Sequence, residues 1–355
     1  MVVIGGGIVG ASVAFHLADG GADVVLVDDD REGRATYAGA GIVSWPWGDR
    51  KDPIFELRRT AVAGYADLAE RIGARLDVVG ELFVAPPGRL LDESEAALLR
   101  GAVGPVQRLE PEQARIMFPY LAPELCALHV ATTARLHGDA IRNRLIEAAT
   151  AAGAEVVAGR AELVCDGRGV QAVGVADRRI PADDVVIAAG TWSAELASQA
   201  GAKLAVAPQR GQILHLGVRE DTTAMPVVQP LGADHYLLAF PDQRVVIGAT
   251  RESRSGLDPR LTAAGVASVI DSALRVAPGL GNATLCELRV GLRPTTPDGN
   301  PILGPISGCA GLWAAAGTGR QGLTIGPYCG RLVADAILGR PAELDLTPYA
   351  AGRFG

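Results

Sequence analysis

The chain has 355 residues, of which 48% are hydrophobic and 21% charged, and its formal net charge is −7 at pH 7. This length exceeds what one ordinary hydrophobic core holds, so two domains are expected. The acidic balance, with no Lys/Arg cluster that would follow a phosphate backbone, argues against a nucleic-acid partner. Residues 1–7 lack a basic segment and turn glycine-rich at once, so we expect no signal peptide, no membrane span and a cytoplasmic protein.

The five cysteines are scattered and odd in number, and no two have the spacing of metal ligands. We therefore predict free thiols in a reducing compartment and no metal site.

The first 28 residues carry the pattern of a nucleotide-binding β-α-β unit. Residues 2–4 are an apolar strand, and residues 5–10 read Gly-Gly-Gly-Ile-Val-Gly, a GxGxxG motif that opens a helix with apolar residues every four positions. Residues 24–27 form a second apolar strand that ends in Asp28. A GxGxxG between a strand and a helix, followed by an acidic residue, predicts a dinucleotide site.

Each part of this motif has a mechanical reason. Gly5 permits the tight turn, Gly7 lets the backbone approach a pyrophosphate, and Gly10 lets the helix pack closely on the strand. The helix N-terminus offers bare N–H groups to the anion, and Asp28 is placed to accept hydrogen bonds from a ribose. The motif does not decide between FAD and NAD.

The remaining elements follow in chain order. We expect helices at 52–72, 139–150, 262–276 and 323–338, a β-meander at 162–179, buried strands at 185–190 and 312–316, and strand-rich material at 206–290. The β-α-β pattern thus occurs at the beginning, the middle and the end of the chain. This order predicts an α/β fold with a discontinuous Rossmann-type domain and a second α+β domain built on a largely antiparallel sheet. The predicted boundaries are 1–75, 136–205 and 288–355 for the nucleotide domain, and 76–135 and 206–287 for the substrate domain.

Six segments resemble, in order and rough spacing, the FAD-dependent D-amino-acid oxidase family, and its glycine oxidase and D-amino-acid dehydrogenase branches most of all. These segments are 2–12, 38–44, 186–193, 291–294, 296–299 and 317–322. The resemblance covers the whole chain and implies an extended FAD, with its adenosine at Asp28 and its flavin near the C-terminal motif. Gly291 stands where covalent members of the family have a cysteine, which implies non-covalent FAD.

The resemblance also implies which residues bind the cofactor. They are Gly5, Gly7, Ile8, Val9, Gly10, Asp28, Asp29, Ala38, Gly39, Gly41, Ile42, Ala189, Gly190, Trp192, Arg293, Gly317, Gly319, Arg320, Gln321, Gly322, Leu323 and Thr324. The helix after Gly322 would direct its positive end at the flavin, where negative charge gathers on reduction.

At the substrate end, Arg293 resembles the carboxylate-binding arginine of the family, Tyr236 its partner hydroxyl, and Arg320 a second arginine of the glycine oxidase branch. A guanidinium suits this task because its planar fork binds a carboxylate through two hydrogen bonds. His235 sits beside Tyr236, and neighbours on a strand face opposite ways, so at most one of them is expected in the pocket. If that one is His235, a general base is available and an alcohol becomes a candidate substrate.

The expected function is oxidation of a D-amino acid, glycine or an N-methyl amino acid by hydride transfer from the α-carbon to flavin N5, which gives an imine that hydrolyses. The electrons then pass to O2 or another acceptor. Three alternatives stay open: a flavin-dependent 2-hydroxy-acid dehydrogenase, a flavoprotein carrier without turnover of its own, and an NAD-only dehydrogenase. The side-chain specificity and the oligomeric state, a homo-oligomer included, are not decided by the sequence.

Overall fold

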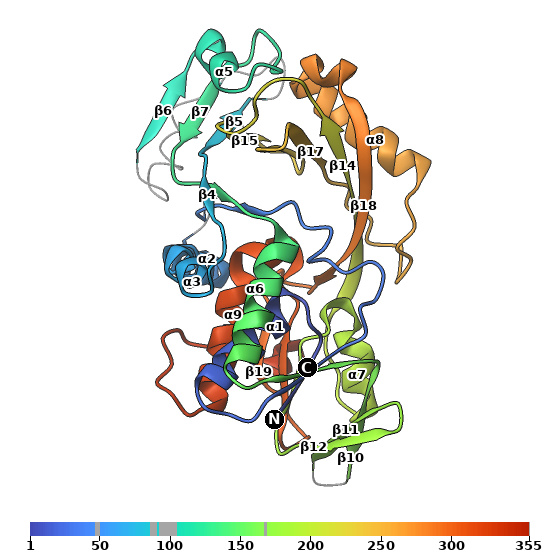
Figure 1. The fold of residues 1–355 in the computed structure, drawn as a ribbon. Coiled ribbons are helices and arrows are strands. Elements are labelled where there is room, and N and C mark those ends of the chain that lie inside the picture. Colours follow the sequence, from blue (N-terminus) through green and yellow to red (C-terminus); the bar gives the residue numbers. More distant parts are fainter. Residues whose placement is uncertain (47–49, 86–90, 92–104, 167–168, 355) are drawn as a thin grey trace.

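The computed structural model describes residues 1–46, 50–85, 91, 105–166 and 169–354. Two large sheets dominate it, one in the upper and one in the lower half of Figure 1.

The lower sheet has six strands, and its centre is parallel. In spatial order its strands are β19 (Ile302–Pro305), β20 (Leu312–Ala316), β13 (Val185–Ile187), β1 (Val2–Ile4), β2 (Val25–Asp28) and β9 (Glu155–Ala158). β1 lies between β13 and β2 and pairs in parallel with both, whereas β19 is antiparallel to β20. Strands from the beginning, the middle and the end of the chain therefore share one sheet, as the predicted α/β fold requires.

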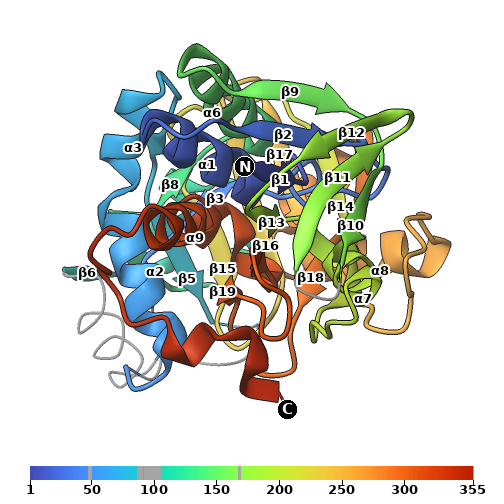
Figure 2. The ribbon, with the colours of Figure 1, turned by 90° about the horizontal axis from the view of Figure 1, so that it is seen from below.

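Both faces of this sheet are covered, which explains its continuous apolar strands. One face carries α1 (Ile8–Asp19), α6 (Gly138–Ala151) and α9 (Gly322–Ile337), which share a core with Val3. The other face carries the small sheet of β10 (Ala161–Cys165), β11 (Val170–Val175) and β12 (Arg178–Pro181), with α7 (Ser193–Gln199), over Val2 and Ile4. Figure 2 shows the helices and this small sheet on opposite sides.

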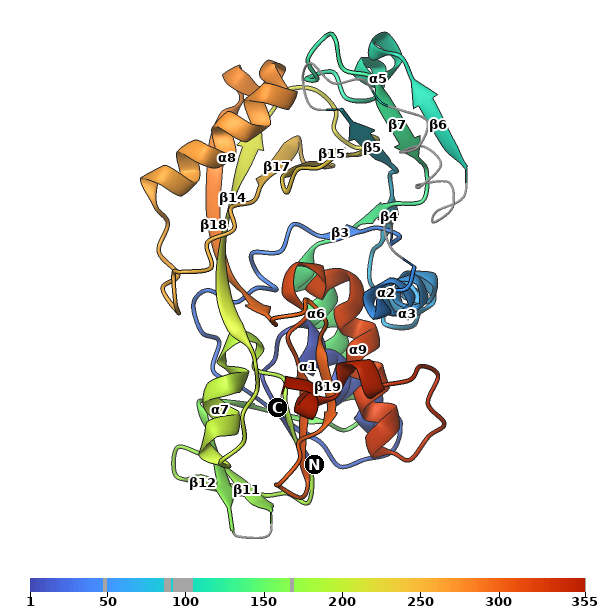
Figure 3. The ribbon, with the colours of Figure 1, turned by 180° about the vertical axis from the view of Figure 1, so that it is seen from behind.

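The upper sheet has eight strands and is antiparallel except where β15 meets β5. In order its strands are β18 (Thr284–Thr295), β14 (Ala207–Gly217), β17 (Arg244–Gly248), β16 (Tyr236–Phe240), β15 (Val227–Pro230), β5 (Glu81–Val84), β7 (Ala127–Val130) and β6 (Val106–Leu109). β14 and β18 are the long strands of this sheet, and in Figure 3 they run from the upper sheet into the lower half of the molecule.

The two faces of the upper sheet have different surroundings. Alternate residues such as Leu237 and Val245 pack with α8 (Ala263–Val276), and α5 (Pro111–Met117) contributes to the same core. On the opposite face Leu238 and Phe240 pack with Ile42, which belongs to the loop of residues 38–44 that the family resemblance assigns to the cofactor. The second face therefore forms a wall against the lower half of the molecule.

The remaining elements are short. They are β3 (Ile42–Val43), β8 (Ala134–Arg135) and β4 (Asp77–Val78), which form one sheet, the helices α2 (Pro53–Ala63) and α3 (Tyr65–Arg71), and the 3-10 turns η1 (Gly190–Trp192), η2 (Pro278–Asn282), η3 (Gly319–Gln321), η4 (Thr347–Tyr349) and η5 (Ala351–Phe354). The helical structure expected over 52–72 is present, but as two helices: Gly64 ends α2 and begins α3, and its near-zero ψ turns the chain between them.

The predicted α/β class and antiparallel second sheet are confirmed. β18 crosses the predicted boundary at 288, and the division into two domains stays a prediction. Within the described residues, all five cysteines are free thiols, no cluster of potential metal ligands occurs, and no helix is long and apolar enough to cross a membrane.

Candidate active site

One long pocket follows the carboxyl ends of β1, β2 and β13 and continues between the two large sheets. It encloses about 2090 Å³, the solvent at its open mouth included. All the predicted cofactor residues line it except Gly10 and Gly317. Crevices at the carboxyl ends of parallel strands are where open α/β sheets bind their ligands.

The glycines of the first turn bring backbone segments into direct contact. Gly5 has a φ of +107°, and a Cβ there would lie 2.5 Å from the carbonyl oxygen of Ala188. A Cβ on Gly10 would lie 1.8 Å from the carbonyl oxygen of Gly5. Gly10 therefore packs α1 against the end of β1, which explains why it lies outside the pocket lining.

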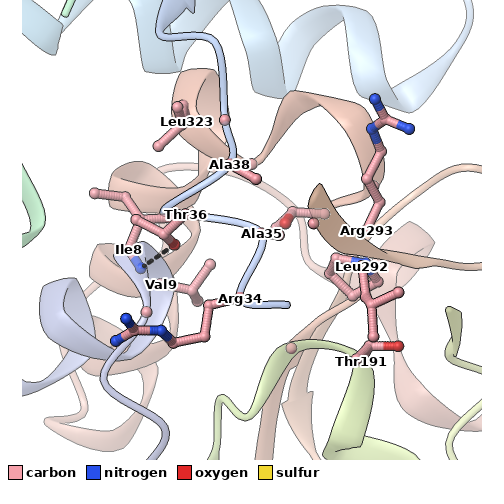
Figure 4. Close-up of a pocket in the computed structure, with 18 of the residues that line it drawn as sticks. Ile8, Val9, Arg34, Ala35, Thr36, Ala38, Thr191, Leu292, Arg293 and Leu323 are labelled. Carbon is pink, nitrogen blue, oxygen red and sulfur yellow. Dashed lines mark hydrogen bonds between the residues drawn. The ribbon is translucent and has the colours of Figure 1, made fainter. Parts of the chain in front are cut away.

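Side chains that the motif does not contain complete this end of the pocket. The hydroxyl of Thr36 accepts a hydrogen bond from the backbone N–H of Ile8 at 3.0 Å, at the first turn of α1 (Figure 4). Arg34, which lines the same pocket, adds a positive charge. Sequence reasoning missed both, because they lie in a loop without periodic pattern.

Asp28 lies at the end of β2 and lines the pocket, as predicted. Its Oδ2 is paired with Arg142 of α6 at 2.9 Å, and Arg142 also donates to the carbonyl oxygen of Gly6 at 2.6 Å. Arg142, another residue missed from sequence, fixes the carboxylate beside the glycine turn. Fixing a carboxylate in this way reduces the entropy it loses when a ribose binds.

The other end of the nucleotide site is the N-terminus of α9. Gly322, Leu323 and Thr324 all line the pocket there, and the Thr324 hydroxyl donates to the carbonyl oxygen of Ile42 at 3.0 Å. Gly317, which has a φ of +74°, lies behind the lining, where a Cβ would be 2.5 Å from the Thr296 methyl group. The first turn of α9 thus presents its N–H groups and the positive end of its dipole to the pocket.

Arg293 and Tyr236, both predicted to bind the substrate, line the same pocket, and the charge of Arg293 influences the phenol of Tyr236. Arg293 extends from β18 and donates through Nη1 to the carbonyl oxygen of Thr250 at 2.9 Å. Its guanidinium lies over Gly211, where a Cβ would be 2.4 Å from both terminal nitrogens. Burial raises the pKa of Tyr236 to about 12, against a smaller opposing effect of the Arg293 charge, so the phenol is neutral and can donate. In Figure 4 the side chains of Arg293 and Arg34 extend in opposite directions, although Arg34 forms a β-bridge with Leu292, the neighbour of Arg293.

The expectation that only one of His235 and Tyr236 enters the pocket is wrong, because both line it. β16 begins at Tyr236, so His235 precedes the strand and the alternation of side chains does not apply to it. Burial lowers the pKa of His235, which favours the neutral imidazole.

Three further charged residues stand near Arg293. Arg320 of η3 lines the pocket as predicted, together with Arg251 and Arg58, which sequence reasoning missed. Burial lowers the pKa of Arg58 to about 10, and its Nε donates to the carbonyl oxygen of Ser44 at 2.8 Å. These arginines come from segments far apart in sequence, so no local pattern could have grouped them.

The pocket fits an extended dinucleotide. A Cβ on Gly5 or Gly6 of its glycine turn would collide with neighbouring atoms, two helix N-termini line it, and so do Asp28 and Arg293. The sequence profile of the family described as "DAO: FAD dependent oxidoreductase" matches residues 1–336. The chain belongs to this FAD-dependent oxidoreductase family.

Relatives and solved structures agree with this assignment. A glycine oxidase from Pseudomonas putida is 32% identical and covers 100% of this chain, with 99% of its own length matched. The crystal structure of an iminodiacetate oxidase from Chelativorans sp. BNC1 is 37% identical, with a TM-score of 0.91 over 99% of this chain and 98% of the other. Glycine oxidase from Geobacillus kaustophilus gives a TM-score of 0.86 at 27% identity over 99% and 98%.

The predicted family, Rossmann-type fold and FAD cofactor are thereby confirmed. The dinucleotide is FAD and not NAD, the alternative left open by the GxGxxG motif. This family member is an FAD-dependent oxidoreductase whose relatives act on amines. The roles of individual site residues, and non-covalent attachment of the FAD, stay predictions. Gly291, which lines the pocket, has no side chain through which a flavin could be attached.

Proposed function

We propose that this enzyme oxidises a small amine that carries a carboxylate on the reacting carbon, such as glycine, a D-amino acid, or an N-substituted glycine of the iminodiacetate type. The observation that supports this proposal is the pair formed by Arg293 and Tyr236 at the substrate end of the pocket.

Arg293 is suited to hold the substrate carboxylate. One of its terminal nitrogens donates to Thr250, and contact with the Gly211 backbone fixes the plane of its guanidinium. A guanidinium has five N–H donors, so donors remain for a carboxylate after this bond is made. Because the arginine is partly buried, its charge acts in an environment of lower dielectric than water, where a charge-assisted hydrogen bond is stronger.

Tyr236 supports the same anchor. Its side chain is half-buried and its hydroxyl is neutral, and a Cβ on Gly248 would lie 2.9 Å from that oxygen, so the phenol is held tightly against β17. A neutral hydroxyl can donate a second hydrogen bond to a carboxylate that Arg293 binds. With the carboxylate fixed at two points, the C–H bond beside the amine has a defined direction in the pocket.

FAD, when bound, would supply the two-electron acceptor for a hydride from that carbon. The substrate nitrogen loses a proton to water, and the imine product hydrolyses to a carbonyl compound and an amine. This chemistry needs orientation and a neutral amine more than it needs a strong base from the protein. The upper sheet, whose inner face packs on the loop of residues 38–44, limits the access of water to the site.

The test is the reaction of the purified holoenzyme with glycine, sarcosine and D-alanine, followed anaerobically by the loss of flavin absorption. We expect Arg293→Met to lower kcat/KM by about 30- to 5000-fold, since breaking a desolvated charge pair costs about 2–5 kcal/mol. Arg293→Lys keeps the positive charge but loses the planar fork of donors, so its kcat/KM should lie between those of the wild type and Arg293→Met. Flavin content per polypeptide serves as the control, because it separates lost substrate binding from lost folding. Wild-type kcat/KM in Arg293→Met would exclude this role.

A 2-hydroxy-acid dehydrogenase remains the second candidate, because His235 does line the pocket and burial favours its neutral form. This function requires a base, and activity should then follow the titration of His235. Flavin reduction by glycolate or lactate but by none of the amines, with loss of that activity in His235→Asn, would favour it.

A further inference from the structure

The substrate end of the pocket carries more positive charge than one carboxylate would use. Arg293 is assigned to the carboxylate beside the reacting carbon in the function proposed above. Arg251, which follows β17, and Arg320 of η3 line the same pocket and have no part in that assignment. Arg58 also lines it, but this guanidinium is bonded to Ser44 and faces the charge of the buried Glu81 carboxyl.

Asp234 shows how Arg251 and Arg320 are arranged. Its Oδ1 lies 2.5 Å from Nη2 of Arg251 and 3.7 Å from Nη1 of Arg320. Both guanidinium groups therefore approach one carboxylate oxygen, which shows that this part of the pocket can hold a carboxylate between them. The Asp234 side chain is 55% exposed, as expected at the open mouth of a pocket.

The charges at this end do not balance. Three guanidinium groups, those of Arg251, Arg293 and Arg320, face one acidic side chain among the described residues at this end, Asp234. The difference is two positive charges. A substrate with one carboxylate would leave one of them without an acidic partner at the mouth of the pocket, where Arg320 is 59% exposed, whereas a substrate with two carboxylates would pair with both. Arginine is also the side chain best suited to such pairs, because its fork matches a carboxylate.

We propose that Arg251 and Arg320 form a second carboxylate-binding subsite, and that the preferred substrate is a small amine bearing two carboxylates. This inference rests on the proposed function, in which Arg293 holds the first carboxylate. Asp234 keeps the two guanidinium groups in position between turnovers. The second carboxylate of the substrate then binds to donors that Asp234 does not use, and this contact determines specificity without taking part in hydride transfer.

The second carboxylate can be attached to the amine nitrogen, as in iminodiacetate, or to the side chain, as in aspartate. The first experiment compares kcat/KM for iminodiacetate and for D- and L-aspartate with that for their uncharged counterparts, the monoamide of iminodiacetate and D- and L-asparagine. We expect one dicarboxylate to exceed its amide by at least thirtyfold, and the pair that shows this preference identifies the point of attachment.

The second experiment measures the same preference in Arg251→Gln and Arg320→Gln. Each variant should reduce the ratio of the two kcat/KM values at least tenfold, because the amide cannot use the second subsite. Arg144→Gln, which makes the same charge change on the exposed face of α6 away from the pocket, is the control and should keep the wild-type ratio. A merely structural ion pair would lower kcat/KM for both substrates by the same factor, and that result would overturn the inference.

The failures of the two proposals are distinguishable. If wild-type flavin is reduced equally well by each dicarboxylate and its amide, the second subsite is excluded while amine oxidation stands. If none of the amines reduces the flavin, the proposed function is excluded and the inference with it.

Discussion

The nucleotide end of the pocket is formed mainly by backbone groups, and the substrate end mainly by side chains. The nucleotide end consists largely of backbone: a glycine turn without room for a Cβ, and two helix N-termini that present N–H groups. The substrate end consists of side chains, chiefly Tyr236, His235 and arginines, that project from the upper sheet and from loops. Backbone sites tolerate little substitution and serve one ligand, whereas side-chain sites can change their ligand by single replacements.

The largest effect is expected from a substitution at Gly10, in the nucleotide end of the pocket. Gly10→Ala would place a Cβ 1.8 Å from the Gly5 carbonyl oxygen, so α1 and β1 must separate and the pyrophosphate turn must deform. We expect a protein without bound FAD, destabilised by about 3 kcal/mol. The ratio of flavin to polypeptide absorbance and a denaturant titration measure the two effects.

The matched control for Gly10→Ala is Gly64→Ala, since a Cβ there makes only ordinary contact, 3.8 Å from the Thr60 carbonyl oxygen. Full FAD content in Gly10→Ala would mean that the nucleotide end is less dependent on backbone contact than the structure indicates.

Low pH should reduce the stability of the half of the molecule that contains α1, because of His16. Burial in α1 lowers the pKa of this imidazole from 6.5 to about 4, so between these values the unfolded chain binds a proton that the folded chain does not. The stability contributed by neutral His16 is therefore full above pH 6.5 and is lost as the pH falls toward 4. The loss amounts to about 3 kcal/mol.

The measurement is the free energy of unfolding against pH for the wild type and for His16→Gln. The variant should show a shallower slope between pH 6.5 and 4 even if its stability at pH 8 is lower. Equal slopes would assign the acid sensitivity to other groups.

The smallest effect is expected at the substrate end, in Tyr236→Phe. Losing one hydrogen bond from a neutral hydroxyl to the substrate carboxylate costs about 1.5 kcal/mol, so kcat/KM should fall by roughly tenfold while FAD content stays unchanged. Because the pKa of Tyr236 is about 12, the wild-type rate should show no titration of this group below pH 11. An unaltered kcat/KM in the variant would mean that the Tyr236 hydroxyl does not bind the substrate and that the residue only packs within β16.

The same contrast explains how much of the site the sequence could predict. Gly5, Gly7 and Asp28 were found because their spacing within 28 residues reports a local β-α-β unit. Thr36 and Arg142 were not, since their roles depend on a loop and a helix folding against that unit. Arg293 and Arg320 were found by family resemblance alone, and no pattern links them to one another.

Arg251 and His235 show most clearly which features of the site could not be predicted from the sequence. Arg251 follows the end of a strand without any motif, and its partner Asp234 lies before the neighbouring strand, so only the paired β16 and β17 bring them together. His235 was misjudged because the alternation rule was applied one residue beyond the start of β16. The start of a strand cannot be located to one residue from its apolar pattern.

The position of β1 between β2 and β13 also has a consequence for biosynthesis. β1 pairs with a strand about 180 residues later, and Ser12 of α1 donates to the carbonyl oxygen of Pro327 in α9. Contacts so distant in sequence close late, because the entropy of a long loop must be overcome first. The cradle for FAD is therefore incomplete until α9 has been translated, and the flavin absorption of the holoenzyme reports that α9 has packed against α1.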